Sequence, residues 1–285
     1  MENLTSPKVI KALMENHGLR FSKSLGQNYI INPAICPKIA QMGGAGPEVG
    51  VLEIGAGVGV LTAELAKICR KAVCVEIDSG LLPLLAETLA EFSNVSIVNA
   101  DVLKLDLHAL LREHFADMPV IVCANLPYYI TSPILMKLLE EKLPVRSITV
   151  MVQKETAQRL CAPLPSRQAG AITAAVHYYA QPQLLFTVSP GSFLPPPEVE
   201  SAVIRLDVRE QPPVQTQSEE MLFRVIKGAF SQRRKTIHNS LSAFFAIDKG
   251  KMANLLEAAG VSPAARAEQL SLADFAAIAN AMAAV

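Results

Sequence analysis

The sequence predicts an α/β fold in which a parallel sheet, covered by helices on both faces, precedes a small all-α C-terminal domain. Apolar strand-like runs alternate with helical segments from Val49 to about Leu206, as is typical of such a sheet. The glycine-rich turn Gly55-Ala56-Gly57-Val58-Gly59 directly follows one of these runs, as in doubly wound nucleotide-binding sheets. Beyond Ser218 the apolar residues recur at helical spacing.

The first strand and its glycine turn indicate a nucleotide site. Glycines after the apolar run Val51 to Ile54 allow a tight turn and let a ligand approach the backbone closely. A GxGxxG dinucleotide fingerprint needs its third glycine at position 60, which is Val60, whereas the third glycine falls one residue earlier, at Gly59. A nicotinamide oxidoreductase is therefore disfavoured, and the chain also lacks an acid or base suited to hydride transfer. A plain strand-to-helix connection is the alternative interpretation of the turn.

Acidic residues end the next two strand-like runs. Glu76 closes the run Ala72 to Val75, about twenty residues past the turn, where a carboxylate can accept both hydrogen bonds of a ribose diol. Asp101 follows the run Val95 to Val98, and its carboxylate can accept a hydrogen bond from an adenine amino group. Taken singly, Glu76 suits a solvated charge and Asp101 suits a turn cap. Their joint spacing favours a site for an adenosine-bearing cofactor.

The motif Asn125-Leu126-Pro127-Tyr128 ends the run Val120 to Ala124 and carries the predicted chemistry. The lone pair of an adenine amine is delocalised into the ring, and accepting hydrogen bonds from its two N–H groups favours the pyramidal, nucleophilic form. The Asn125 side-chain oxygen and the Leu126 carbonyl are suitable acceptors, and Tyr128 offers a ring on which the base can stack. No strong base is needed, because the amine loses its proton after the methyl group arrives. A proline-terminated strand with a packed tyrosine is the alternative interpretation.

The C-terminal part is predicted to be helical and to follow a linker. The polar stretch 209–217 contains Pro212-Pro213, which is typical of a linker. Ser218 can cap a helix with an apolar stripe, and Ser271 with Asp274 can open another. We therefore expect a catalytic domain over residues 1–208, a linker over 209–217 and a helical RNA-binding domain over 218–285.

Length and composition agree with this organisation. The chain has 285 residues, of which 51% are hydrophobic, enough for one large and one smaller core. The start Met1-Glu2-Asn3-Leu4 lacks a basic-then-apolar leader, and no apolar run approaches the roughly 18 residues of a membrane span. The cysteines contain no C-x-x-C pair and the histidines have no metal-ligand spacing, so we expect buried thiols and no metal. A cytoplasmic monomer without a membrane anchor is expected.

Charge is balanced in total but unevenly distributed. The chain has 26 basic and 26 acidic residues, a balance that does not by itself suggest a nucleic-acid-binding protein. Basic residues nevertheless gather in two stretches, 17–47 and 221–251. A charge run is usually a solvated helix face, but together with the adenine-directed motifs these stretches favour phosphate contact. The candidate RNA-binding residues are Arg20, Lys23, Arg233, Arg234 and Lys235.

The combination of motifs resembles the ribosomal RNA adenine dimethyltransferase family, specifically its KsgA type, over nearly the whole chain. The individual motifs are short, and their combination and order make the resemblance specific. The segments that carry it, besides the glycine turn, are Leu25–Ile30, Val75–Asp78, Asn125–Tyr128, Met151–Glu155, Phe193–Leu206, Gln232–Thr236 and Arg266–Leu270.

The resemblance implies a class I (Rossmann-like) methyltransferase sheet, with S-adenosylmethionine as the methyl donor. It implies dimethylation of two adjacent adenosines near the 3′ end of bacterial small-subunit rRNA during ribosome biogenesis, with the small ribosomal subunit as partner. It also implies that Phe193 caps the flipped adenine opposite Tyr128, and Tyr29 stands where phenylalanine is common in the family. The expected donor pocket consists of Asn28, Ile30, Gly55, Gly57, Glu76, Asp101, Val102 and Asn125.

Two related functions stay open beside this one. One is a large-subunit rRNA adenine methyltransferase of the type linked with macrolide resistance, and the other is a ribosome-assembly factor that acts mainly by binding. The long helical tail with Gln232–Thr236 favours the small-subunit enzyme, by resemblance alone. The intact pair Glu76 and Asp101, together with Asn125, argues against loss of activity.

Overall fold

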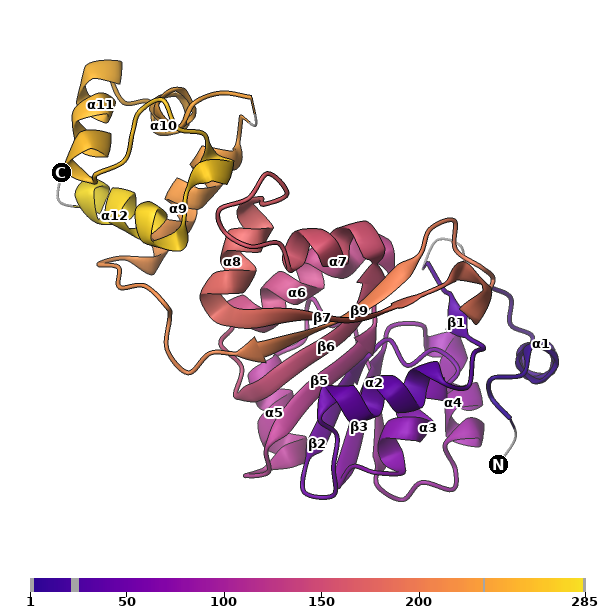
Figure 1. Ribbon diagram of the computed structural model, residues 1–285. Helices are drawn as coiled ribbons and strands as arrows, with labels where there is room; N and C mark the ends of the chain where they lie inside the picture. Colours follow the sequence, from indigo (N-terminus) through magenta and orange to yellow (C-terminus); the bar gives the residue numbers. More distant parts are fainter. Residues whose placement is uncertain (1–2, 22–25, 233, 284–285) are drawn as a thin grey trace. The chain divides into compact units, whose positions relative to one another are not determined.

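A computed structural model describes residues 3–21, 26–232 and 234–283 of the chain (Figure 1). It divides into two compact units, Met1–Ala157 with Gln183–Val208 and Gln158–Pro182 with Arg209–Val285. We call them the sheet unit and the helical unit. The helical unit includes residues 158–182, which the sequence analysis placed with the sheet. The reason is that Ala174 and Tyr178 are buried in the hydrophobic core of the helical unit.

A seven-stranded sheet with the order β4-β3-β2-β5-β6-β9-β7 forms the centre of the sheet unit. The first five strands in this order are parallel, whereas β9 runs antiparallel to β6. A separate antiparallel pair joins β1 to β8. The strands are β1 Tyr29–Ile30, β2 Gly50–Ile54, β3 Lys71–Glu76, β4 Val95–Asn99, β5 Val120–Asn125, β6 Val145–Gln153, β7 Ala180–Val188, β8 Phe193–Leu194 and β9 Ser201–Val208. The predicted α/β class is confirmed.

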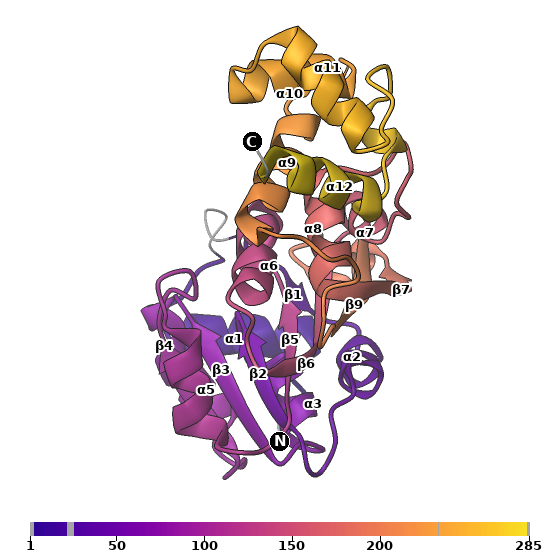
Figure 2. The same ribbon diagram turned by 90° about the vertical axis from the view of Figure 1, so that its left-hand side faces the viewer.

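Helices cover both faces of this sheet. Figures 1 and 2 show α2 and α3 on one face and α5 and α6 on the other. For α3, α5 and α6, which connect parallel strands, right-handed crossovers require this arrangement. The helices that precede or connect these strands are α1 Pro7–Asn16, α2 Ile35–Gly43, α3 Val60–Ala66, α4 Leu82–Thr88, α5 Leu107–Phe115, α6 Thr131–Glu140 and α7 Lys154–Leu160.

The strand order reverses beside β2, and this positions the site. From β2 the chain proceeds outward to β3 and β4, and it then crosses to β5 on the other side of β2. Connections therefore leave the carboxyl ends of β2 and β5 in opposite directions, which opens a crevice between them. The glycine turn, Glu76 and Asn125 all lie at this edge, because each one ends or directly follows one of these strands.

In the helical unit, α9 to α12 start at local side-chain caps, whereas α8 starts after Gly170 without one. Ser218 accepts a hydrogen bond from the Met221 N–H, and Ser271 and Asp274 bond reciprocally to each other's backbone N–H, so both predicted helix starts are confirmed. The helices are α8 Ala171–Tyr179, α9 Glu219–Phe230, α10 Ile237–Phe245, α11 Lys249–Ala258 and α12 Leu272–Ala283, with a short 3₁₀ turn at Ala267–Gln269.

The cysteines are unpaired thiols. Cys36, Cys69, Cys74 and Cys123 are buried, and Cys161 is partly buried. Burial raises the pKa of Cys69 and of Cys161 to about 11, so both thiols are neutral near pH 7. Within residues 3–21, 26–232 and 234–283, no helix combines the length and apolar character needed to cross a membrane.

Candidate functional site

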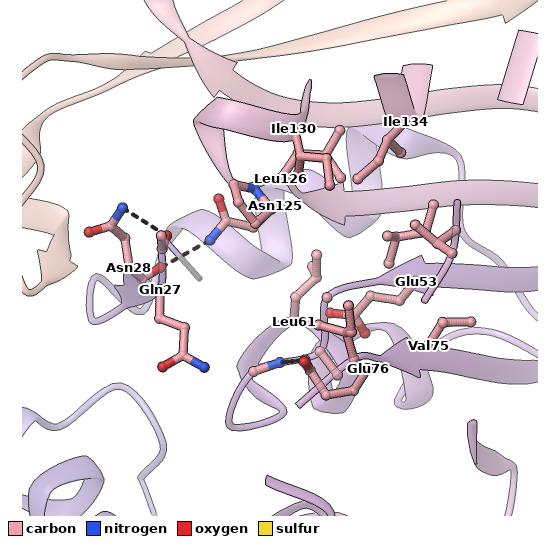
Figure 3. A pocket seen from close by; sticks show the side chains of 18 of the residues that line it. Gln27, Asn28, Glu53, Leu61, Val75, Glu76, Asn125, Leu126, Ile130 and Ile134 are labelled. Carbon is pink, nitrogen blue, oxygen red and sulfur yellow. Dashed lines mark hydrogen bonds between the residues drawn. The ribbon is translucent and has the colours of Figure 1, made fainter. Parts of the chain in front are cut away.

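A pocket opens at the carboxyl edge of the sheet, around the ends of β2, β3 and β5 (Figure 3). It brings together segments far apart in sequence, from the Gly26–Ile30 segment to the 3₁₀ turn η2, Tyr128–Ile130. Ten residues predicted to form the site line this pocket: Asn28, Ile30, Gly55, Gly57, Glu76, Asp101, Val102, Asn125, Leu126 and Tyr128. Among the described residues, no cluster of His, Cys, Asp and Glu suits a metal ion.

The glycine turn depends on backbone conformations that other residues rarely adopt. Gly55, Gly57 and Gly59 have φ of +78°, +59° and +87°. A Cβ atom at Gly57 would lie 2.9 Å from Cε1 of Tyr29, closer than real Cβ contacts allow. The turn therefore packs directly against the Tyr29 ring, and its backbone faces the pocket without intervening side chains.

Glu76 connects this turn to the end of β3. Its Oε2 accepts a hydrogen bond from the Gly57 N–H and its Oε1 accepts one from the Asp78 N–H, both at 2.9 Å. The side chain is buried, and burial raises the pKa of Glu76 while these two N–H bonds oppose the rise. Each carboxylate oxygen has a second lone pair, so Glu76 can still accept hydrogen bonds from a ligand.

Asp101 caps a turn and also lines the pocket. Its Oδ1 accepts a hydrogen bond from the Leu103 N–H at 3.0 Å, and its Oδ2 lies 3.6 Å from Nζ of the exposed Lys104. The turn-cap interpretation of Asp101 is confirmed, whereas its contact with an adenine amino group stays a prediction. The backbone bond fixes the orientation of the carboxylate at the pocket wall.

Asn125 is held in one orientation by its amide nitrogen. Nδ2 donates to the Asn28 carbonyl at 3.1 Å, as Figure 3 shows, so Oδ1 is the end of the amide left to accept a hydrogen bond in the pocket. The Leu126 N–H donates to the Met151 carbonyl at 3.2 Å. No donor within the described ranges bonds to the Leu126 carbonyl. The end of β5 thus supplies a pair of neighbouring neutral oxygen acceptors.

Tyr128 lies beside these acceptors, and its hydroxyl is anchored. The hydroxyl oxygen is 2.7 Å from Ser201 Oγ, at the start of β9. The ring is half-buried, and burial raises the pKa of this hydroxyl above 10, its ordinary value. Pro127 before it has a φ of −58°, the value to which its ring restricts it, and a ψ of 134°.

Phe193, which the family resemblance implies opposite Tyr128 and over the adenine, lies away from the pocket lining in this structure, and its capping role stays a prediction. Phe193 does not line the pocket, and its side chain is only 2% exposed. It pairs with Ile30 between β8 and β1 and packs in the hydrophobic core of the sheet unit. Phe193 therefore supports the Tyr29–Ile30 strand from behind. The sequence could not show this, because the pairing of two short distant strands decides which way the ring points.

Glu53 lines the pocket but was not predicted to belong to it. Its side chain is 1% exposed, and its Oε2 has no hydrogen-bond partner among the described residues. Parallel register places Cys74 on one side of it and Cys123 on the other, so no cation neighbours it in the sheet. Burial, helped by the charge of Glu76, raises the pKa of Glu53 to about 8. An acidic residue inside the apolar run Val51–Ile54 was the sequence signal that could have identified it.

The candidate RNA-binding residues lie on both units. Arg20 is exposed on the sheet unit, and Arg234 and Lys235 are exposed on the helical unit. Lys23 and Arg233 lie outside the described residues. A hollow of the helical unit, not predicted from the sequence, is lined by Pro165–Arg167 and by Ala264, Arg266, Glu268 and Gln269. The exposed Arg167 and Arg266 make this hollow basic.

Comparisons with known proteins give one family for the chain. The sequence profile of a family described as Ribosomal RNA adenine dimethylase matches residues 18–284. Ribosomal RNA small subunit methyltransferase A of Geobacillus thermodenitrificans is 45% identical over 99% of this chain and 97% of its own. The protein of the same name from Bacillus mycoides is 44% identical over 99% and 98%.

Two solved structures share the fold. The crystal structure of the 23S rRNA methyltransferase ErmE has a TM-score of 0.68 and 25% identity, covering 90% of this chain and 100% of that one. A dimethyladenosine transferase from Plasmodium falciparum has a TM-score of 0.73 and 23% identity, covering 87% and 95%. The second likeness, below 25% identity, supports the fold alone.

If Glu53 is neutral in the folded protein, the difference in folding stability between the parent and a Glu53→Gln variant should depend on pH. Because its pKa is about 8 in the folded protein and ordinarily 4.5, the folded state keeps a proton that the unfolded chain releases between these values. Folding stability should therefore fall as pH rises through this window, and the cost is complete above pH 8. Glu53→Gln removes the cost. We expect this variant to gain stability over the parent on going from pH 5 to pH 8, by up to roughly 4 kcal/mol.

Urea unfolding of both proteins at pH 5 and pH 8 measures this difference. Glu48→Gln, at a side chain that is 81% exposed, is the matched control and should show no such trend. An equal stability difference between Glu53→Gln and its parent at both pH values would contradict the assignment of a neutral Glu53.

Proposed function

The chain belongs to the ribosomal RNA adenine dimethylase family, and from this premise we propose that its pocket binds S-adenosylmethionine and presents an adenine amine to it. The protein is an rRNA adenine dimethyltransferase that acts on small-subunit ribosomal RNA. The observation that carries the assignment of the site is the orientation of Asn125, whose amide nitrogen is bonded to Asn28 while its oxygen is free to accept. The finer proposal is that two adjacent adenosines near the 3′ end of that RNA are each methylated twice.

The lining residues fit S-adenosylmethionine. Glu76 places a carboxylate at the end of β3, where it can accept the hydroxyls of an unphosphorylated ribose. Asp101, with the buried Val102 beside it, suits the amino edge and the face of adenine. Gly55 and Gly57, both at positive φ, let the turn follow the pocket wall as bare backbone that the donor can approach. When bound, this donor supplies an electrophilic methyl group.

The residues at the end of β5 make the amine nucleophilic. An adenine amine has two N–H groups, and Asn125 Oδ1 and the Leu126 carbonyl offer one neutral acceptor for each. Accepting these bonds draws the nitrogen toward the pyramidal form and directs its lone pair outward. Tyr128, anchored through Ser201, supports the base from the side. Rotation of the Asn125 amide would break its bond to Asn28, so the acceptor is already in place before the RNA arrives.

The site does not depend on a strong base. The carboxylates of Glu76 and Asp101 already accept hydrogen bonds from backbone N–H groups, which hold them in place on the donor side of the pocket. A methylated adenine amine is acidic enough to lose its extra proton to water. Positioning and polarisation are therefore the contributions of these side chains to the rate.

We propose that the helical unit, with Arg20 of the sheet unit, contacts rRNA phosphates. Exposed Arg234 and Lys235, together with Lys23 and Arg233 from the sequence analysis, supply positive charge, and the hollow beside Arg167 and Arg266 adds more. The proposed partner is the small ribosomal subunit, which places the reaction in the cytoplasm. We propose that the enzyme acts as a monomer. The balanced total charge is compatible with this because local charge determines phosphate contact.

Large-subunit RNA is the less favoured substrate. The large-subunit methyltransferase ErmE is 25% identical to this chain, whereas the small-subunit methyltransferases are 44–45% identical. A binding-only assembly factor would not need the oriented Asn125 amide. Both rivals are separated from the proposed function by one transfer experiment.

We expect the enzyme to transfer labelled methyl groups from S-adenosylmethionine to unmethylated small ribosomal subunits. Unmethylated large subunits, tested in parallel, should accept no label. Mass spectrometry of the product should give dimethyladenosine at adjacent positions. Label in the large subunit alone would support the macrolide-resistance type of enzyme, and binding to small subunits without label would support an assembly factor.

Asn125→Ala should lower kcat for transfer by at least about 100-fold, because one of the two polarising acceptors is removed. Donor affinity should change far less, since Gly57, Glu76 and Asp101 are untouched. Calorimetry with S-adenosylmethionine and single-turnover methyl transfer measure the two quantities. Asn16→Ala, at the exposed end of α1, is the control that should retain parental activity. A kcat that stays at the parental value in Asn125→Ala would rule out the polarising role.

Arg234→Ala should reduce the salt dependence of rRNA binding by about one unit of the log–log slope, because one phosphate contact is lost. Binding to small subunits over a range of KCl concentrations measures this slope. Arg70→Ala is the matched control. Arg70 precedes β3 at the amino edge of the sheet, away from the pocket at the carboxyl edge, and it pairs with Glu48. A slope equal to the parent's would show that Arg234 is a solvated charge in the turn between α9 and α10.

A further inference from the structure

Tyr129 is a pocket residue to which the proposed reaction assigns no role. It follows Tyr128 in the turn η2 and lines the same pocket. Its side chain is 62% exposed, the highest value among the large apolar side chains of the described residues. An isolated exposed apolar side chain is ordinary, but an exposed aromatic ring at the opening of a nucleotide-sized pocket is a candidate contact for a base.

Consecutive tyrosines are held in contrasting ways at this turn. The Tyr128 ring is half-buried and its hydroxyl is 2.7 Å from Ser201 Oγ. Tyr129, by contrast, forms no ring pair or hydrogen bond within the part of the chain that the structure describes. Tyr128 is therefore committed to the pocket wall, whereas Tyr129 is available to a ligand from outside.

The Tyr129 ring is nevertheless restrained along one edge. A Cβ atom at Gly26 would lie 3.4 Å from both Cδ1 and Cε1 of this ring, and equally near Cβ of Pro127. Gly26 has a φ of +61°, a conformation that disfavours a side chain at this position, so the ring lies at van der Waals distance from a backbone that stays a glycine. The ring is thus supported by the Gly26 segment, which limits the entropy that stacking would cost.

We propose that Tyr129 is a stacking platform for the nucleobase next to the adenine that occupies the pocket. This rests on the proposed function, because it requires an RNA strand whose target base is turned into the site. The neighbouring nucleotide is covalently joined to the target and must then lie at the pocket opening, where Tyr129 is exposed. With adjacent adenosines as substrates, the base next to the target is the other adenine at each step.

Methyl transfer to unmethylated small subunits by the full chain tests this assignment. Tyr129→Ala should raise KM for the subunits about 5- to 150-fold, the range that corresponds to loss of one aromatic–base stack, and should change kcat less. Tyr129→Phe keeps the ring and should restore KM to within about twofold of the parent. Leu184→Ala, at a 40% exposed residue outside the pocket, is the control for loss of an exposed apolar side chain.

A parental KM in Tyr129→Ala would overturn the proposal. So would an equal rise of KM in Tyr129→Phe, which would assign the effect to the hydroxyl. The unsubstituted enzyme separates this inference from the proposed function: no transfer by that enzyme refutes the function, whereas parental KM in the Ala variant refutes only the platform.

Fluorescence gives a second readout that does not require turnover. The chain contains no tryptophan, so Tyr129→Trp introduces a single indole at the proposed platform. An RNA oligonucleotide with two adjacent adenosines should quench this indole. An oligonucleotide lacking one of the two bases, with its sugar and phosphate intact, should quench it less. Equal quenching by the two RNAs, or quenching only when another ribosomal component is added, would show that a nucleobase is not the occupant.

Discussion

The site depends on one buried carboxylate that accepts backbone hydrogen bonds. Glu76 bonds to Gly57 and Asp78, and so joins the glycine turn after β2 to the end of β3. A buried carboxylate is tolerated only when such donors compensate its desolvation, and here they come from the two loops that form the donor side of the pocket. The position of the turn then fixes the Tyr29 ring, which packs against Gly57. Binding and folding thus use the same side chain.

A second constraint keeps the acceptor side of the pocket neutral. The Asn125 amide is oriented by the Asn28 carbonyl, and this bond links the end of β5 to the segment before β1. Neutral oxygens polarise an amine without drawing a proton from it prematurely, and they attract a cationic sulfonium less strongly than carboxylates would. The two sides of the pocket therefore differ in charge as the proposed chemistry requires. Tyr129 extends the acceptor side toward the RNA, outside the region where methyl transfer takes place.

Behind the pocket, a cross-strand row of the sheet explains the unusual state of Glu53. Register places Cys74, Glu53, Cys123 and Thr149 side by side on β3, β2, β5 and β6. Burial raises the pKa of Glu53 and of both neighbouring thiols, so the neutral forms of all three groups are favoured. A neutral row costs less to bury than an isolated charge. The sheet consequently carries a carboxylic acid beneath the glycine turn without a cationic partner.

The sequence by itself determined the fold class and the edge of the sheet that forms the site, because strand ends and glycine spacing are local signals. The same signals gave seven of the lining residues, whereas Asn28, Ile30 and Val102 were implied only by the family resemblance. The starts of α9 and α12 were likewise local, since a cap and its N–H partner lie within three residues. Only the tertiary structure decided that Phe193 lies in the core, that Glu53 is a buried member of the pocket, and that residues 158–182 belong with the helical unit. These features depend on which distant strands and helices pack together. Long-range packing and strand register set the direction and burial of a side chain, and the spacing of apolar residues along the sequence does not reveal them.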